Sequence, residues 1–104
     1  MRKMNEQQYI LLFGRLGKNP ELKYTKEQKA VCAFSLAQNL EGQDKPIWHN
    51  IIIWGKQAEQ CNLYLKKGSP VFVRGQIQSR SYTSSQGETK QFTEVKADLV
   101  GFTY

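Results

Sequence analysis

The chain has 104 residues, 39% of them hydrophobic, and its 15 lysines and arginines against 9 aspartates and glutamates give a net charge of +6. This length is that of one small domain, 1–104, and excludes a second catalytic domain within it. The hydrophobic fraction is too high for a disordered tail. The basic charge favours a polyanionic partner, nucleic acid before an anionic membrane, although a merely basic surface remains the alternative.

No segment approaches the ~20 apolar residues of a membrane span. Arg2 and Lys3 resemble the start of a signal peptide, but polar residues follow where an apolar run is required. The only cysteines, Cys32 and Cys61, lie in apolar patterns without CxxC spacing, so we expect buried free thiols in a reducing compartment. These features predict a cytoplasmic protein with no membrane partner.

Apolar residues alternate with polar ones along most of the chain, which is typical of strands. We expect strands over residues 9–16, 30–40, 47–54, 71–82 and 89–102. The stretch 21–29 is polar and lysine-rich, and 84–87 is a hairpin turn. On the inner face we expect Ile77 in the fourth strand, and Val95, Ala97 and Leu99 in the fifth.

One helix is predicted after the third strand. Gly55 opens a run of helix formers in which Ala58, Cys61 and Leu65 lie on one stripe. We expect Lys66 and Lys67 in its last turn, with a cap at Gly68.

The order of three strands, a helix and two strands predicts a mainly β, or all-β, fold. A small antiparallel five-stranded barrel with one helix between its third and fourth strands is the OB-fold arrangement. An α+β sandwich is the alternative, but long strands interrupted by glycine favour closure into a barrel.

Catalytic chemistry has little support. The chain has one histidine, His49, which lies in an apolar strand, and its carboxylates are scattered singly among basic residues. Metal sites need three or four converging ligands, and phosphate-binding loops need a glycine-rich strand–helix turn. We therefore expect no metal, no cofactor and no enzymatic activity.

Aromatic residues indicate a binding function instead. Trp48 and Trp54 are six residues apart in one strand and therefore project from the same face, while Ile47, Ile51 and Ile53 of the other parity supply the core. Tyr82 shares a polar strand face with basic residues. Unpaired bases stack on such rings while lysines and arginines hold the phosphates. The alternative is that both tryptophans belong to the core.

Six short motifs, which occur in order along the chain, resemble those of a known protein family. Over residues 8–104 the chain resembles the bacterial single-stranded-DNA-binding proteins. The matching segments are LFGRLGKNPELKY (12–24), AFSLA (33–37), WH (48–49) with WGK (54–56), YLKKGS (64–69), VRGQI (73–77) and TEV (93–95).

The resemblance implies an OB-fold subunit, assembled as a homotetramer or a dimer, that coats single-stranded DNA without strong sequence preference and binds RNA more weakly. It implies stacking on Trp48, Trp54 and Tyr82, and a subunit interface at His49. The basic positions implied to contact phosphates are Lys23, Lys56, Lys67 and Arg80. Arg15 and Arg74 complete the basic candidates.

The chain departs from the resemblance at several positions. Asn50 stands where relatives often carry arginine, which removes one phosphate contact. A tryptophan that many relatives carry after the second strand is missing, so one stacking platform is either lost or replaced by Phe92 or Tyr24. Relatives continue into a disordered tail with an acidic tip, whereas this sequence stops at Tyr104. Replication or recombination proteins are therefore expected to bind by another route.

The sequence thus predicts a nucleoid-associated protein that protects single-stranded DNA in replication, recombination or repair. One alternative is a specialised paralogue that lacks the tail, such as a primosomal, competence or plasmid protein. The other is an OB-fold adaptor between proteins that has lost nucleic-acid binding.

Overall fold

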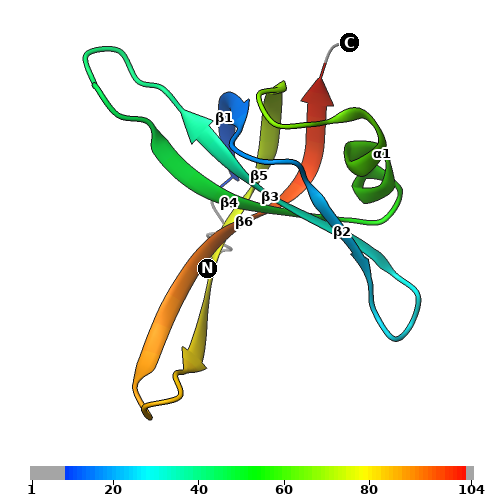
Figure 1. Cartoon of the computed structure of the whole chain (residues 1–104), viewed down its shortest axis with the longest axis vertical. Helices are drawn as coiled ribbons and strands as arrows, with labels where there is room; N and C mark the ends of the chain where they lie inside the picture. The colour runs from blue at the N-terminus through cyan, green and yellow to red at the C-terminus, as the bar shows by residue number, and fades with distance from the viewer. Residues whose placement is uncertain (1–8, 103–104) are drawn as a thin grey trace, which may run out of the picture.

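The computed structural model describes residues 9–102, so the charged segment at Arg2 and Lys3 lies outside the described residues. Six strands and one helix follow one another along the chain (Figure 1). They are β1 (Tyr9–Leu16), β2 (Glu21–Tyr24), β3 (Ala30–Gln38), β4 (Ile47–Trp54), α1 (Lys56–Tyr64), β5 (Pro70–Thr83) and β6 (Thr89–Phe102).

Five of the strands form a closed ring. The sheet order is β1-β5-β6-β4-β3, and a further pairing between β1 and β3 joins its ends. The backbones of β1 and β3 approach closely where the ring closes. A Cβ on Gly14 of β1 would lie only 2.3 Å from the carbonyl oxygen of Ala37, so this position has room for glycine alone. This mainly β ring, with its helix between β4 and β5, confirms the predicted OB-fold.

One pair of strands corrects the prediction of an antiparallel barrel. β4 and β6 are parallel, with Ile51 opposite Val95, whereas the other pairs are antiparallel. Strand directions cannot alternate around a closed ring of five, so at least one neighbouring pair must run parallel.

The short strand β2 was not predicted. Its four residues pair with β3, from Glu21 opposite Ala33 to Tyr24 opposite Ala30. Leu22 is its one residue that packs partly against the core, so the segment has no apolar alternation to reveal it. β2 lies outside the ring and widens the sheet beside β3.

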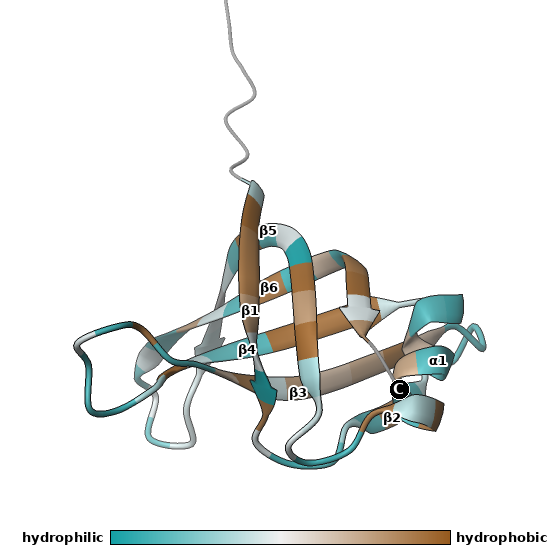
Figure 2. Ribbon diagram, turned by 90° about the horizontal axis from the view of Figure 1, so that it is seen from above, coloured by the Kyte–Doolittle hydropathy of each residue, from teal (hydrophilic) through white to brown (hydrophobic). Residues whose placement is uncertain are grey.

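The core fills the ring, and apolar residues follow β1, β5, β3 and β4 around it (Figure 2). Its largest fully buried side chains include Leu36, Ile51, Ile53 and Val73. Cys32 and Cys61 are buried and free, as predicted. Burial raises the pKa of Cys32 to about 11 and that of Cys61 to about 12, so both thiols stay protonated at neutral pH.

Helix α1 ends earlier than expected. Leu65 is already extended and buries its side chain in the core, so Lys66 and Lys67 lie beyond the helix. The following turn is fixed to β1, because the Gly68 amide donates to the Leu16 carbonyl at 2.8 Å. Pairing with the end of β1 therefore replaces the expected last helical turn.

A β-bulge reverses the inward pattern of β6. Arg74 lies opposite Leu99 but Gly75 lies opposite Ala97, so Asp98 is an extra residue. Val95 and Ala97 point inward as predicted, whereas Leu99 is exposed and Val100 takes its place in the core.

Ile77 is also exposed, contrary to prediction. Among the described residues, β1 pairs with β5 only as far as Gln76. Beyond this point β5 and β6 continue as a two-stranded arm that projects from the ring (Figure 1). Ile77 lies where this arm begins and has no β1 residue beside it.

Candidate nucleic-acid interface

The outer surface of β4 carries Trp48, Asn50, Ile52 and Trp54, which we call the tryptophan face. Trp48 is 57% exposed and Trp54 is 41% exposed, while Ile51 and Ile53 between them are buried. The outward tryptophans and the buried Ile51 and Ile53 are as predicted, and the alternative that both tryptophans belong to the core is wrong. Six residues along a strand separate the two positions by about 20 Å. Ile47 is exposed, contrary to prediction, because it pairs with Gln38, beyond the residues of β3 at which β1 closes the ring.

A groove of about 340 Å³ crosses this face between the two tryptophan positions. Asn50 and Ile52 line it from β4, and Phe92 lines it from β6. Its other lining residues are Lys18, Asn19, Glu21, Ala33, Phe34, Ser35, Ile51 and Glu94. The groove brings together the predicted residues Asn50 and Phe92, which lie far apart in the chain.

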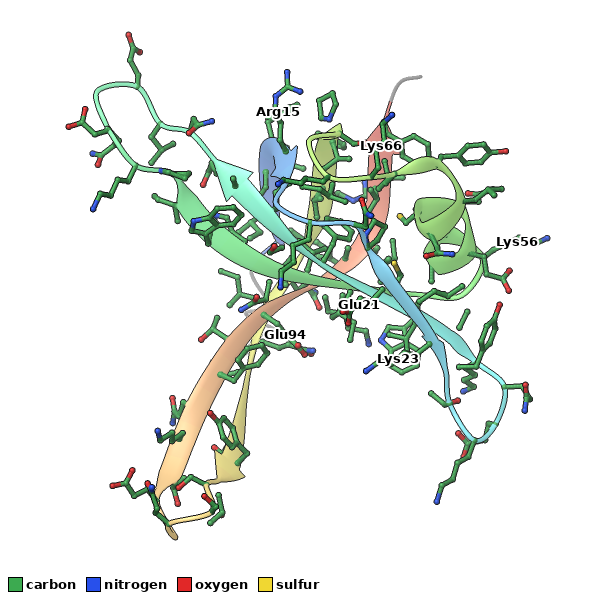
Figure 3. All side chains as sticks on the ribbon, in the orientation of Figure 1. Arg15, Glu21, Lys23, Lys56, Lys66 and Glu94 are labelled. Atoms are coloured by element: carbon green, nitrogen blue, oxygen red, sulfur yellow. The ribbon has the colours of Figure 1, made fainter. Side chains whose placement is uncertain are left out.

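Two carboxylates lie in this groove, and sequence reasoning missed both of them. Glu94 is only 5% exposed and accepts a 2.6 Å hydrogen bond from the Gln78 side chain. Glu21 of β2 and Glu94 of β6 both line the groove, and both are labelled near the middle of Figure 3. Lys18 lines the same groove, so charges of both signs meet there.

Lysines surround Trp54. Lys23 of β2 lies opposite Val31, which lies opposite Trp54, so the three positions form one row across the sheet. Two hollows of about 430 and 360 Å³ both border Trp54; Lys29 lines both of them, Lys56 the first and Lys96 the second. Lys56 projects outward from the start of α1 (Figure 3).

Lys29 and Lys96 were not predicted as site residues. The signal for Lys96 was present, because the inward residues Val95 and Ala97 place it on the outer face. Lys29 follows the turn at Gln28, whose φ is 67°, and only the folded loop brings it to Trp54.

The β5–β6 arm extends the tryptophan face. Tyr82 is exposed opposite Lys90, and Arg80 lies opposite Phe92. Because alternate residues of a strand share one face, Lys90 and its partner Tyr82 lie on the same side of the arm as Phe92 and Glu94, which line the groove. The Arg80 side chain lies outside the described part of the structure.

The two predicted arginines are not among the residues that line the groove, although Arg15 shares a row with Trp48, because it lies opposite Ala37, which lies opposite Trp48. Arg74 forms a 2.8 Å ion pair with Asp98, and the two share a hollow with Tyr9. The Arg15 guanidinium donates to the Gly68 carbonyl at the end of the ring. The structure therefore does not bring either arginine into the groove.

Lys67 and Tyr24 are also not among the residues that line the groove. Lys67 lies in the turn after α1, where its amide donates to the Asn19 side chain at the margin of the groove. Tyr24 donates to Glu59 of α1 at 2.8 Å. Of the two candidate replacements for the missing tryptophan, Phe92 rather than Tyr24 therefore joins the groove.

His49 lies at the margin of the core, in the same row as Leu36 and Leu16. It is half-buried, and its Nε2 lies 2.9 Å from the Gln38 side-chain oxygen. Burial lowers the pKa of His49, so the ring is neutral at pH 7.

Within residues 9–102, no three side chains of histidine, cysteine, aspartate or glutamate gather as metal ligands. In the same part of the chain, no helix has the length and apolar character needed to cross a membrane.

Comparison with known proteins adds the family. The model of the single-strand binding protein family matches residues 7–103. Proteins named single-stranded DNA-binding protein are similar over 89% of the chain: it is 43% identical to one from Halalkalibacterium halodurans and 42% identical to one from Bacillus cereus. It is 41% identical to single-stranded DNA-binding protein A of Bacillus subtilis. The alignment spans 57–58% of the length of these relatives. The chain belongs to the single-strand binding protein family.

Proposed function

We propose that this chain, 1–104, is a single non-catalytic domain that binds single-stranded DNA without strong sequence preference. The observation that carries this function is the pair of exposed tryptophans flanking a groove, with lysines around one of them. The names of the relatives support the same ligand. Protection of single strands during replication, recombination or repair is the corresponding role.

The charges suggest how a strand lies on the tryptophan face. Lys23, Lys56 and Lys96 attract phosphates around Trp54, and Lys18 adds a positive charge beside the groove. The bases of the strand are then turned toward the tryptophan face, where Trp48, Trp54 and Phe92 offer rings for stacking. Such stacking contributes about 1–3 kcal/mol per base and does not depend on base identity.

Titration with oligo-dT tests this function. We expect it to quench tryptophan fluorescence strongly, with weaker binding to an RNA of the same length and little to a blunt duplex. The logarithm of the binding constant should fall with log salt by about 0.7 for each phosphate neutralised. Absence of quenching and of binding by anisotropy at low salt would exclude the function and favour a protein adaptor.

We infer that the chain assembles with copies of itself, as a tetramer or a dimer. Tyr9, Leu11, Phe13, Phe72 and Leu99 form an apolar face on β1, β5 and β6. Phe13 is 66% exposed, and its ring centre lies 5.1 Å from that of Phe72. Exposed apolar clusters of this kind mark protein interfaces. We propose half-buried His49 as a further subunit contact.

A charge in this apolar face should break the assembly. We expect Phe13→Glu to lower the mass measured by sedimentation equilibrium, because burying a carboxylate in an apolar contact is costly. Leu63→Glu is the matched control, since Leu63 is exposed on α1, outside the apolar face. An unchanged mass for Phe13→Glu, or an equal loss for Leu63→Glu, would argue against the apolar face as the interface.

We propose that the protein works in the cytoplasm at the nucleoid, where single strands arise. The two buried free thiols accord with a reducing compartment. Replication or recombination proteins are the proposed partners.

A further inference from the structure

The ring of Trp48 lies directly over Gly17, the residue that follows β1. A Cβ built on Gly17 would lie 2.5 Å from Cζ3 and 2.7 Å from Cη2 of the indole. Both atoms belong to the outer edge of the six-membered ring. The Oγ atom of Ser35 would also lie close to this Cβ, at 3.1 Å. The missing side chain of Gly17 therefore makes the space that Trp48 occupies.

Space, rather than backbone conformation, requires glycine here. The glycines with positive φ are Gly42, Gly55, Gly68 and Gly87, so the backbone at residue 17 is open to alanine. The backbone on both sides is also fixed: the Gly17 amide donates to the Ser35 carbonyl at 3.0 Å, and the Leu16 amide donates to the Ser69 carbonyl at 3.1 Å. When a methyl group is added, the exposed Trp48 ring is the part free to move.

We propose that Gly17 is a positioning residue for DNA binding, which holds the Trp48 ring in the orientation that stacks on a base. The inference rests on the proposed function. Trp48 is more than half exposed, so few other contacts restrict its side-chain torsions. A ring held before binding loses less conformational freedom when the base arrives, and therefore binds more tightly.

A cycle of variants separates positioning from general damage. The variants are Gly17→Ala, Trp48→Phe and the two combined. Phenylalanine lacks the Cζ3 and Cη2 atoms of indole, so its smaller ring leaves room for the alanine methyl. We expect Gly17→Ala to weaken oligo-dT binding roughly 5- to 10-fold when Trp48 is present, within the range of one stacked base. In the Trp48→Phe background the same change should cost less than about twofold, because the clash is absent.

A second readout needs no DNA. In a Trp54→Phe background Trp48 is the one remaining tryptophan. Gly17→Ala should then shift its emission and raise its quenching by acrylamide in the free protein. Circular dichroism and the thermal midpoint verify that each variant is folded.

Each result distinguishes the positioning role from its alternatives. If Gly17→Ala weakens binding equally with tryptophan and with phenylalanine at position 48, the inference is overturned and the effect is a general structural one. Unchanged acrylamide quenching of Trp48 would overturn it as well. If the unaltered protein fails to bind oligo-dT, the proposed function fails, whereas the acrylamide measurement still reports whether Gly17 holds the ring.

Discussion

Replacing both tryptophans with alanine should reduce the affinity for oligo-dT by about 2–6 kcal/mol, because each stacked base contributes about 1–3 kcal/mol. The positions are about 20 Å apart along β4, so the two losses should be nearly additive. Trp48→Ala and Trp54→Ala separately should each show part of the effect. Anisotropy of a fluorescein-labelled oligonucleotide measures it, since the double variant has no tryptophan of its own.

Ile47→Ala is the matched control for this loss. Ile47 lies on β4 and is exposed, but it has the opposite parity to the tryptophans. Its removal should change the affinity less than about twofold, since no aromatic ring is lost. A combined loss below about threefold for the tryptophan pair would contradict stacking as the main source of affinity.

Leu36→Ala should have the largest effect on stability. Leu36 is fully buried, and it lies between Leu16 of β1 and His49 of β4, at the point where the ring closes. Removing such a side chain costs about 2–5 kcal/mol, from lost burial and the remaining cavity. This is a large part of the roughly 5–15 kcal/mol that stabilises a small domain.

Urea unfolding followed by circular dichroism measures the loss. Leu40→Ala serves as control, because Leu40 is exposed in the loop after β3 and should change stability by less than about 1 kcal/mol. An equal effect of the two substitutions would show that the core is centred elsewhere.

Three strands have the predicted bounds: Tyr9–Leu16, Ile47–Trp54 and Thr89–Phe102. Runs of apolar and β-forming residues bounded by turn residues reveal where such strands begin and end. β2 escaped prediction since only Leu22 contacts the core. The bulge at Asp98 arises from the pairing of β5 with β6, which no local pattern in β6 records.

The candidate site also has features that could be predicted from the sequence and features that could not. The outward direction of Trp48 and Trp54 follows from the parity of one strand and was predicted. The approach of Lys29 and Lys96 to Trp54 depends on a loop and on a neighbouring strand, so it required the fold. The burial of Glu94 beside the groove likewise depends on β6 lying next to β4.

Photocrosslinking tests the central proposal most directly. An oligonucleotide with 5-bromouracil in place of thymine forms covalent adducts with aromatic rings that stack on it when irradiated. Peptide mapping should locate the adducts on Trp48 and Trp54, with Tyr82 of the arm as a third site. Adducts confined to Tyr9 and Phe13 of the apolar face would show that single strands bind on the other side of the ring, and would contradict the account.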